Sequence, residues 1–152
     1  MAEYLYDSAV PFDSSRIGAA AVYCSDGRFG EQCDDFVHHA LQLPRYDRLA
    51  IPGGAACLAS HFATYREEDA ALAHLEFLIS AHGLNRVVLI AHQDCAFYTK
   101  RLEVSELGLA ERQREDLLTA AARVRQLGPG LTVEAFFAHQ QEGQVTFEWI
   151  EA

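Results

Sequence analysis

Two short apolar runs constrain the fold of this chain more than any other feature. Residues 17–23 and 87–91 contain only small, aliphatic or aromatic side chains, and each run stops where polar residues begin. Neither run alternates between polar and apolar positions, so both faces of each predicted strand are apolar. Such strands are typical of a parallel sheet that helices cover on both faces. The sequence therefore predicts an α/β fold in which both runs are buried strands.

The rest of the chain alternates between predicted helices and strands. We predict helices over residues 32–43, from about 55, over 66–82, shortly after Asp94 and over 109–127, and further strands over 47–51, 131–137 and 144–150. This alternation implies right-handed crossovers and a mainly parallel sheet. A strand order 2-1-3-4 places the two apolar runs side by side, with the last strand antiparallel at the edge. We expect residues 1–152 to form a single domain, with 1–16 as an N-terminal arm or short helix.

Residues that bind transition metals follow both apolar runs. Cys24 ends the first run, and His92 and Cys95 follow the second. Open α/β sheets place their chemistry at the carboxyl ends of strands, where these side chains would meet. Three protein ligands leave one coordination position open, as in catalytic rather than structural zinc sites. Taken alone, Cys24 could equally be an ordinary buried thiol.

Composition narrows the classes of partner and location. The formal net charge of the 152 residues is −10, which argues against nucleic acid or an anionic membrane surface as a partner. No apolar run approaches the ~18 residues of a membrane span. The first residues have neither the basic nor the apolar region of a signal peptide. We therefore expect a cytoplasmic protein whose four cysteines are reduced.

The residues around the two runs resemble a known signature. Cys24-x-Asp26-x-Arg28, followed by His92-x-x-Cys95, resembles the zinc signature of the β-class carbonic anhydrases over about residues 17–150. The resemblance implies Zn²⁺ bound by the two cysteines and the histidine. It also implies a dyad of the aspartate and the arginine, and an obligate homodimer or a higher homo-oligomer.

Three departures from the family pattern concern the substrate pocket. Ala91 and Ala96 flank the His-x-x-Cys segment where the family has glycines. Residues 51–55 read Ile-Pro-Gly-Gly-Ala in place of an Arg-Asn-Ala-Gly type sequence. The region of Ser14 and Ser15 has no counterpart of the family's bicarbonate-binding glutamine. The metal ligands themselves are unaffected.

The chemistry implied is the reversible hydration of CO₂ to bicarbonate by a zinc-bound hydroxide. Asp26 could accept a hydrogen bond from the hydroxide, and Arg28 would keep that carboxylate ionised. The backbone N–H groups of Gly53 and Gly54, expected at a helix N-terminus, could hold the anionic product. Hydrolysis of CS₂ or COS at the same zinc is an alternative. A second is an inactive, zinc-stabilised binding module, although structural zinc would need neither the aspartate nor the arginine.

The other candidate residues have simpler explanations. Cys33 falls on the apolar face of a predicted helix and is expected to pack in the core. Cys57 is expected to be a buried thiol, although it could line the pocket. Asp94 is expected to cap the helix that follows it. Among the histidines, His61 is the candidate for shuttling protons.

Overall fold

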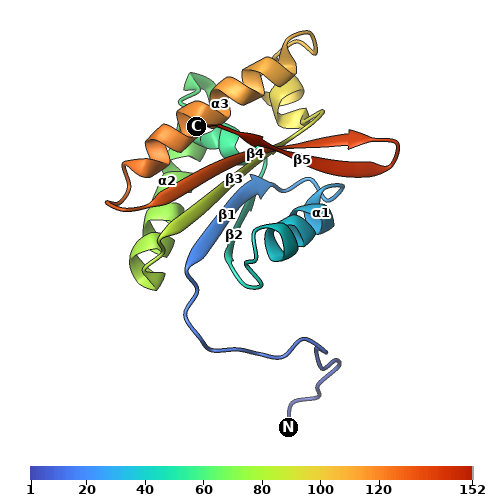
Figure 1. Ribbon diagram of the computed structural model, residues 1–152, viewed down its shortest axis with the longest axis vertical. Helices are drawn as coiled ribbons and strands as arrows, with labels where there is room; N and C mark the ends of the chain where they lie inside the picture. The colour runs from blue at the N-terminus through green and yellow to red at the C-terminus, as the bar shows by residue number, and fades with distance from the viewer. Residues whose placement is uncertain (152) are drawn as a thin grey trace.

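The computed structural model describes residues 1–151 and contains a five-stranded sheet in the order β2-β1-β3-β4-β5 (Figure 1). The strands are β1 (Ala19–Cys24), β2 (Asp47–Ile51), β3 (Arg86–His92), β4 (Thr132–Gln141) and β5 (Gln144–Ile150). The first four strands pair in parallel, and β5 pairs antiparallel with β4 at the edge. The predicted fold class and strand order are confirmed.

The helical segments differ more from the prediction. They are α1 (Gly30–Asp35), η1 (Phe36–Ala40), η2 (Gly54–Leu58), η3 (Phe62–Thr64), α2 (Tyr65–His82), η4 (Phe97–Arg101) and α3 (Leu109–Arg125). The helix predicted over residues 32–43 is a short α-helix that continues as a π-helix, and the one predicted from about 55 is a 3₁₀ helix. The short helix after Asp94 is also a π-helix. None of the helices within residues 1–151 combines the length and apolarity needed to cross a membrane.

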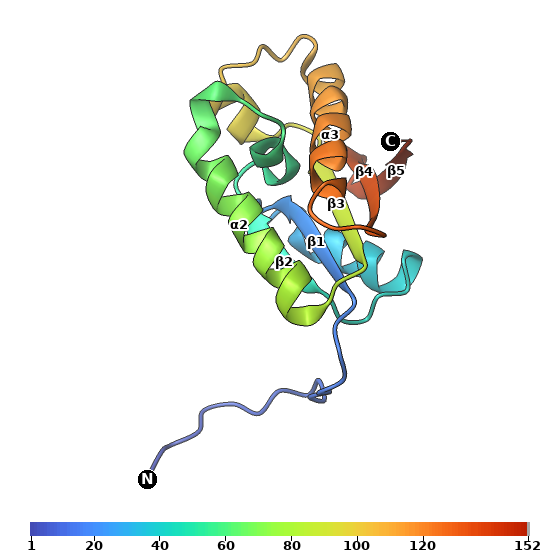
Figure 2. The same ribbon diagram turned by 90° about the vertical axis from the view of Figure 1, so that its left-hand side faces the viewer.

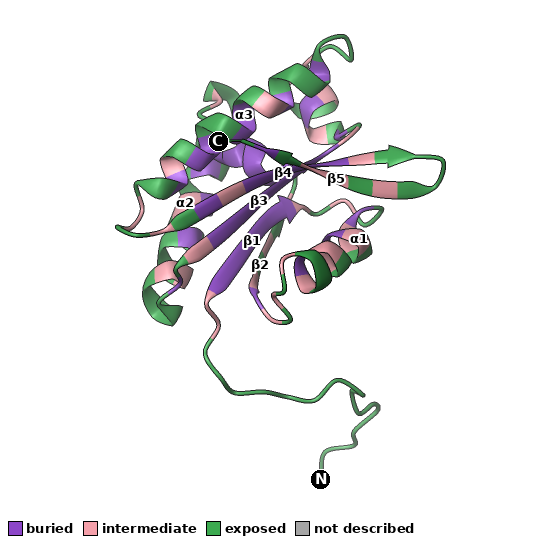
Figure 3. Cartoon of the chain, viewed as in Figure 1, coloured by how far each residue is buried: buried purple, intermediate pink, exposed green. Residues whose placement is uncertain are grey.

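Helices cover both faces of the sheet, as predicted. Figures 1 and 2 show α2 and α3 on one face and α1 on the other. The alternating side chains of β1 explain why its sequence is apolar throughout. Ala20 and Val22 belong to the core beneath α2 and α3, whereas Ala21 and Tyr23 belong to the core beneath α1. In Figure 3, β1 and β3 are accordingly buried along most of their length.

The N-terminal arm is extended and exposed. Residues 1–16 contain no helix or strand and project away from the sheet in Figures 1 and 2. The arm carries large apolar side chains that are each at least 78% exposed: Tyr4, Leu5, Tyr6, Val10 and Phe12. The arm is thus extended chain and leaves much apolar surface in contact with solvent on its own subunit.

Candidate metal centre

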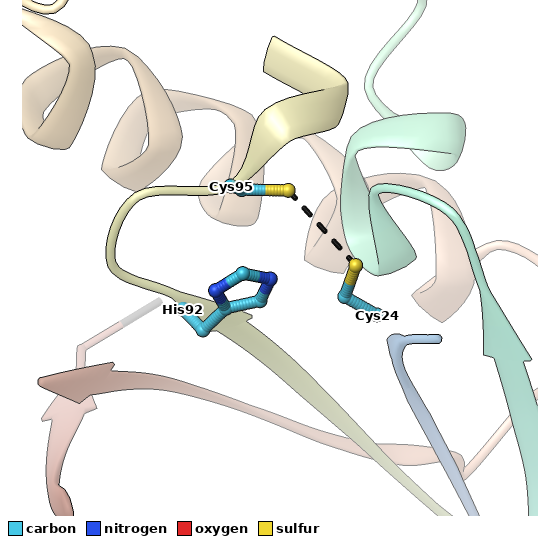
Figure 4. A group of neighbouring side chains, drawn as sticks. All are labelled: Cys24, His92 and Cys95. Carbon is cyan, nitrogen blue, oxygen red and sulfur yellow. Dashed lines mark hydrogen bonds between the residues drawn. The ribbon is translucent and has the colours of Figure 1, made fainter. Parts of the chain in front are cut away.

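The ends of β1 and β3 bring three predicted ligands together (Figure 4). Cys24 ends β1, His92 ends β3, and Cys95 lies in the turn before η4. Their donor atoms all lie within 4.8 Å of one another, and the two Sγ atoms are 4.0 Å apart. Two Zn–S bonds of about 2.3 Å in a tetrahedral arrangement place the sulfurs about 3.8 Å apart. The spacing of the thiols therefore fits a tetrahedral metal ion.

The imidazole of His92 is oriented as metal ligands usually are. Its Nδ1 lies 2.7 Å from the carbonyl oxygen of Gln93, so Nδ1 carries the proton and donates it there. The lone pair is then on Nε2, which is buried and has no hydrogen-bond partner among the described residues. The ring is only 3% exposed and stacks on Phe29. A buried polar atom without a partner calls for an explanation, and a bound cation supplies one.

The two thiols share a negative charge. The hydrogen bond from Cys95 is the main reason that the pKa of Cys24 falls to about 4, and the N–H groups of Asp26 and Gly53 add to the effect. The pKa of Cys95 is raised by the same bond and by burial. Burial disfavours the charged form of His92, but the negative charge of Cys24 and the hydrogen bond to Gln93 outweigh it and raise the pKa of His92. A dication would favour loss of the second thiol proton as well.

Asp26 and Arg28 form the predicted ion pair beside this group. Arg28 Nη2 donates to Asp26 Oδ2 at 2.7 Å, and its Nε lies 3.1 Å from both carboxylate oxygens. The backbone N–H of Arg28 also donates to Oδ1 at 3.0 Å. These bonds lower the pKa of Asp26 to about 2. Asp26 Oδ2 is 3.9 Å from His92 Nε2, so the carboxylate borders the three ligands without bonding to them.

A shallow cavity of about 310 Å³ opens next to the cluster. Its lining residues are Cys24, Ser25, Asp26, Pro52, Gly53, Ala96 and Phe97. Polar atoms of Cys24 and Asp26 therefore face a wall that is apolar at Pro52 and Phe97. A neighbouring, mostly apolar pocket of about 460 Å³ shares those two wall residues and is also lined by Cys57. Cys57 thus lines a pocket beside the candidate site rather than the site itself.

The two glycines after β2 hold η2 against the end of β1. Gly53 has a φ of 80°, and a Cβ there would lie 2.4 Å from the Phe97 ring. Gly54 has a φ of 52°, and a Cβ there would lie 2.8 Å from the backbone nitrogen of Cys24. Only glycine fits such close approaches in this conformation. Of the two, Gly53 lines the cavity, while Gly54 packs beneath it.

Other candidate residues lie away from the cluster. Cys33 is the buried residue of α1 and packs in the core between that helix and the sheet, and burial raises the pKa of its thiol to about 12, as suits a packing role. Asp94 is exposed and does not cap the next helix, because Ala96 is the N-cap of η4 and no side chain caps it. This expectation was wrong because the N-cap position of the π-helix lies two residues after Asp94, at Ala96. His61 has partners on both ring nitrogens and is not among the residues that line the cavity.

Two polar residues of α3 contact the stretch from His92 to Tyr98, which carries two of the three proposed ligands, and the sequence analysis missed both. Gln113 Nε2 donates to the backbone carbonyl of His92 at 2.8 Å, and Asp116 accepts from the Tyr98 hydroxyl at 2.8 Å. A signal was available in the spacing. Gln113 lies midway between Leu109 and Leu117, four residues from each, so it falls on the buried side of the helix.

Comparisons with known proteins identify a family for most of the chain and a shared fold. Residues 15–148 match the family described as "Putative carbonic anhydrase". The β-carbonic anhydrase isoform I of Trichomonas vaginalis has a TM-score of 0.56 at 14% identity, covering 92% of this chain and 87% of that chain. A carbonic anhydrase from Glaciozyma antarctica has a TM-score of 0.58 at 18% identity, covering 87% and 83%. A carbonic anhydrase from Streptococcus mutans has a TM-score of 0.56 at 17% identity, covering 88% of this chain and 81% of that chain. The solved structures share the fold, and comparison with curated proteins gives no match.

Proposed function

Because this chain belongs to that carbonic anhydrase family, we propose that it is a zinc-dependent lyase that reversibly hydrates CO₂ to bicarbonate. The observation that carries the proposal is the Nε2 of His92, which is buried beside two thiols and has no hydrogen-bond partner within residues 1–151. Cys24, His92 and Cys95 would hold the ion. Zinc there would lower the pKa of a bound water from about 15.7 toward 7.

The protein's own groups would orient the reactants. Arg28 keeps Asp26 ionised and fixes its plane, so Oδ2 can accept a hydrogen bond from a water at the open side of the cluster. The apolar wall at Pro52 and Phe97 suits a nonpolar substrate such as CO₂. Gly53 lines the cavity, but its backbone N–H is directed at the Cys24 sulfur, so an anion-binding role for Gly53 stays a prediction. For Gly54 an anion-binding role stays a prediction.

A combined metal and activity measurement tests the proposed function. Protein purified without added metal should contain close to one zinc per chain and hydrate CO₂ in stopped-flow assays between pH 6 and 9. COS and CS₂ should be assayed in parallel. Activity on these sulfur compounds but not on CO₂ would replace the substrate and keep the chemistry. Zinc-loaded protein that is inactive on all three would be a binding module, and the enzyme proposal would fail.

We further propose that the chain forms a homodimer or a larger homo-oligomer. The exposed apolar residues of the arm and the apolar pocket beside Phe97 are surfaces that a monomer leaves in water. Light scattering at micromolar concentration should give at least twice the 16.9 kDa chain mass. The cytoplasmic location also stays a prediction.

A truncated chain is the matched control for the oligomer. Deleting residues 1–12 removes the exposed apolar side chains but keeps Asp13 and Ser15, whose carbonyls accept hydrogen bonds from Arg45. We expect this variant to dissociate into monomers at a higher protein concentration than the full chain does. A full-length chain that stays monomeric at micromolar concentration would refute the proposal.

A further inference from the structure

Gln113 and Asp116 are polar residues in the otherwise apolar buried face of α3. They are 1% and 4% exposed, and they lie three residues apart on the same side of the helix. The other buried residues of α3 are apolar: Leu109, Leu117, Ala120, Ala121 and Val124. Burying a polar side chain is unfavourable unless hydrogen bonds compensate for it. The partners of these two residues therefore indicate what they are for.

Gln113 fixes the peptide that follows His92. Its Nε2 donates to the carbonyl oxygen of His92 at 2.8 Å. The next carbonyl, that of Gln93, accepts the Nδ1–H of the His92 ring at 2.7 Å. Fixing the first peptide thus constrains the second, which in turn sets the direction of His92 Nε2. In Figure 4 this short segment runs from His92 to Cys95.

Asp116 fixes the other end of the same segment. It accepts from the Tyr98 hydroxyl at 2.8 Å and from His61 Nε2 at 2.6 Å, and it forms an ion pair with Arg112, whose Nε lies 3.3 Å away. Tyr98 is buried beside Cys95, and its backbone N–H donates to the Cys95 carbonyl at 3.1 Å. His61 and Arg112 hold the carboxylate, the carboxylate holds the Tyr98 ring, and Tyr98 holds the turn that carries Cys95.

We propose that Gln113 and Asp116 are positioning residues that hold His92 and Cys95 in place for the metal. The inference rests on the proposed zinc site. One helix contacts the His92 end of the ligand segment directly and the Cys95 end through Tyr98, so it can set the separation of the imidazole and the second thiol. Residues that orient metal ligands typically change metal affinity 10–100-fold when they are replaced.

The test measures zinc affinity by competition with a chromophoric chelator. Gln113→Leu removes the donor to His92, and Tyr98→Phe removes the hydroxyl that Asp116 holds. Each variant should bind zinc at least ~10-fold more weakly than wild type. With Co²⁺ in place of zinc, the thiolate charge-transfer and d–d absorption bands should also shift. If Gln113→Leu fails to fold, Gln113→Met and Tyr98→Phe carry the test.

Val124→Ala is the matched control, because it opens a cavity in the same helix far from the ligand segment. It should lose stability while its zinc affinity and Co²⁺ spectrum stay those of wild type. If Val124→Ala loses as much zinc affinity as the Gln113 and Tyr98 variants, the effect reflects general stability and the inference is overturned. Variants that bind zinc as wild type does would also overturn it. If wild type binds no zinc, the proposed function itself fails. If wild type binds zinc and the variants bind it equally well, only this inference fails, so the two failures are distinguishable.

Discussion

Cys95→Ser should lose most of its zinc. The proposed site has three protein ligands, and a serine hydroxyl does not ionise near neutral pH to replace a thiolate. The remaining pair, Cys24 and His92, is too few ligands for a stable zinc site of this kind. Elemental analysis of protein purified without added metal should give close to one zinc per wild-type chain and nearly none in the variant.

Cys33→Ser is the control for that measurement. Cys33 is also a buried thiol, but it belongs to α1 and is not part of the cluster. Its replacement should cost some stability and leave the zinc content unchanged. Full zinc retention in Cys95→Ser would sink the ligand assignment, whatever the activity of the variant.

Arg28→Ala should keep its zinc and lose at least ~100-fold in CO₂ hydration, the scale expected when one preorganising group is removed. The Arg28 side chain is 66% exposed, so its loss should leave the fold intact. Asp26 would lose its bidentate partner and be free to turn toward the cluster, from which it now lies 3.9 Å away at His92 Nε2. We expect it then to occupy the open metal position. Stopped-flow rates would show the loss of activity, and elemental analysis would show that the zinc is retained.

Two further variants control the dyad experiment. Arg48→Ala breaks a comparable surface pair, with Asp34, away from the cavity and should leave activity unchanged. Asp26→Asn should keep zinc but turn over poorly, because the amide cannot act as the charged acceptor. Arg28→Ala with near wild-type activity would show that the pair is only a loop ion pair.

The fold could be predicted because its signals are local and repeated. Apolar residues on both faces of residues 17–23 are explained by the two cores that β1 separates. The types of the short helices could not be predicted in the same way. Whether a five-residue segment forms a 3₁₀ or a π turn depends on what it packs against. The 3₁₀ helix η2, for example, packs at Gly54 against the backbone of Cys24.

The candidate metal centre was predictable to the extent that its residues lie at the ends of strands or in the turn just after one. The positions of Cys24, His92 and Cys95 needed only the strand order. The surroundings of His61 depend on Asp116, a residue 55 positions away, and no local pattern indicates such a pairing. Gln113 was missed for a different reason, since a stripe defined by apolar residues passes over a polar one.

The strand order also fixes when in the life of the chain the centre can exist. Both neighbours of β1 are made after it, and Cys24 and Cys95 are 71 positions apart. At a ribosomal rate of about 5–20 residues per second, Cys24 waits on the order of 4–14 seconds before Cys95 is even synthesised. Its thiol spends nearly all of that interval without either partner ligand, because His92 is made only three residues before Cys95, and the centre can assemble only after most of the chain has been synthesised.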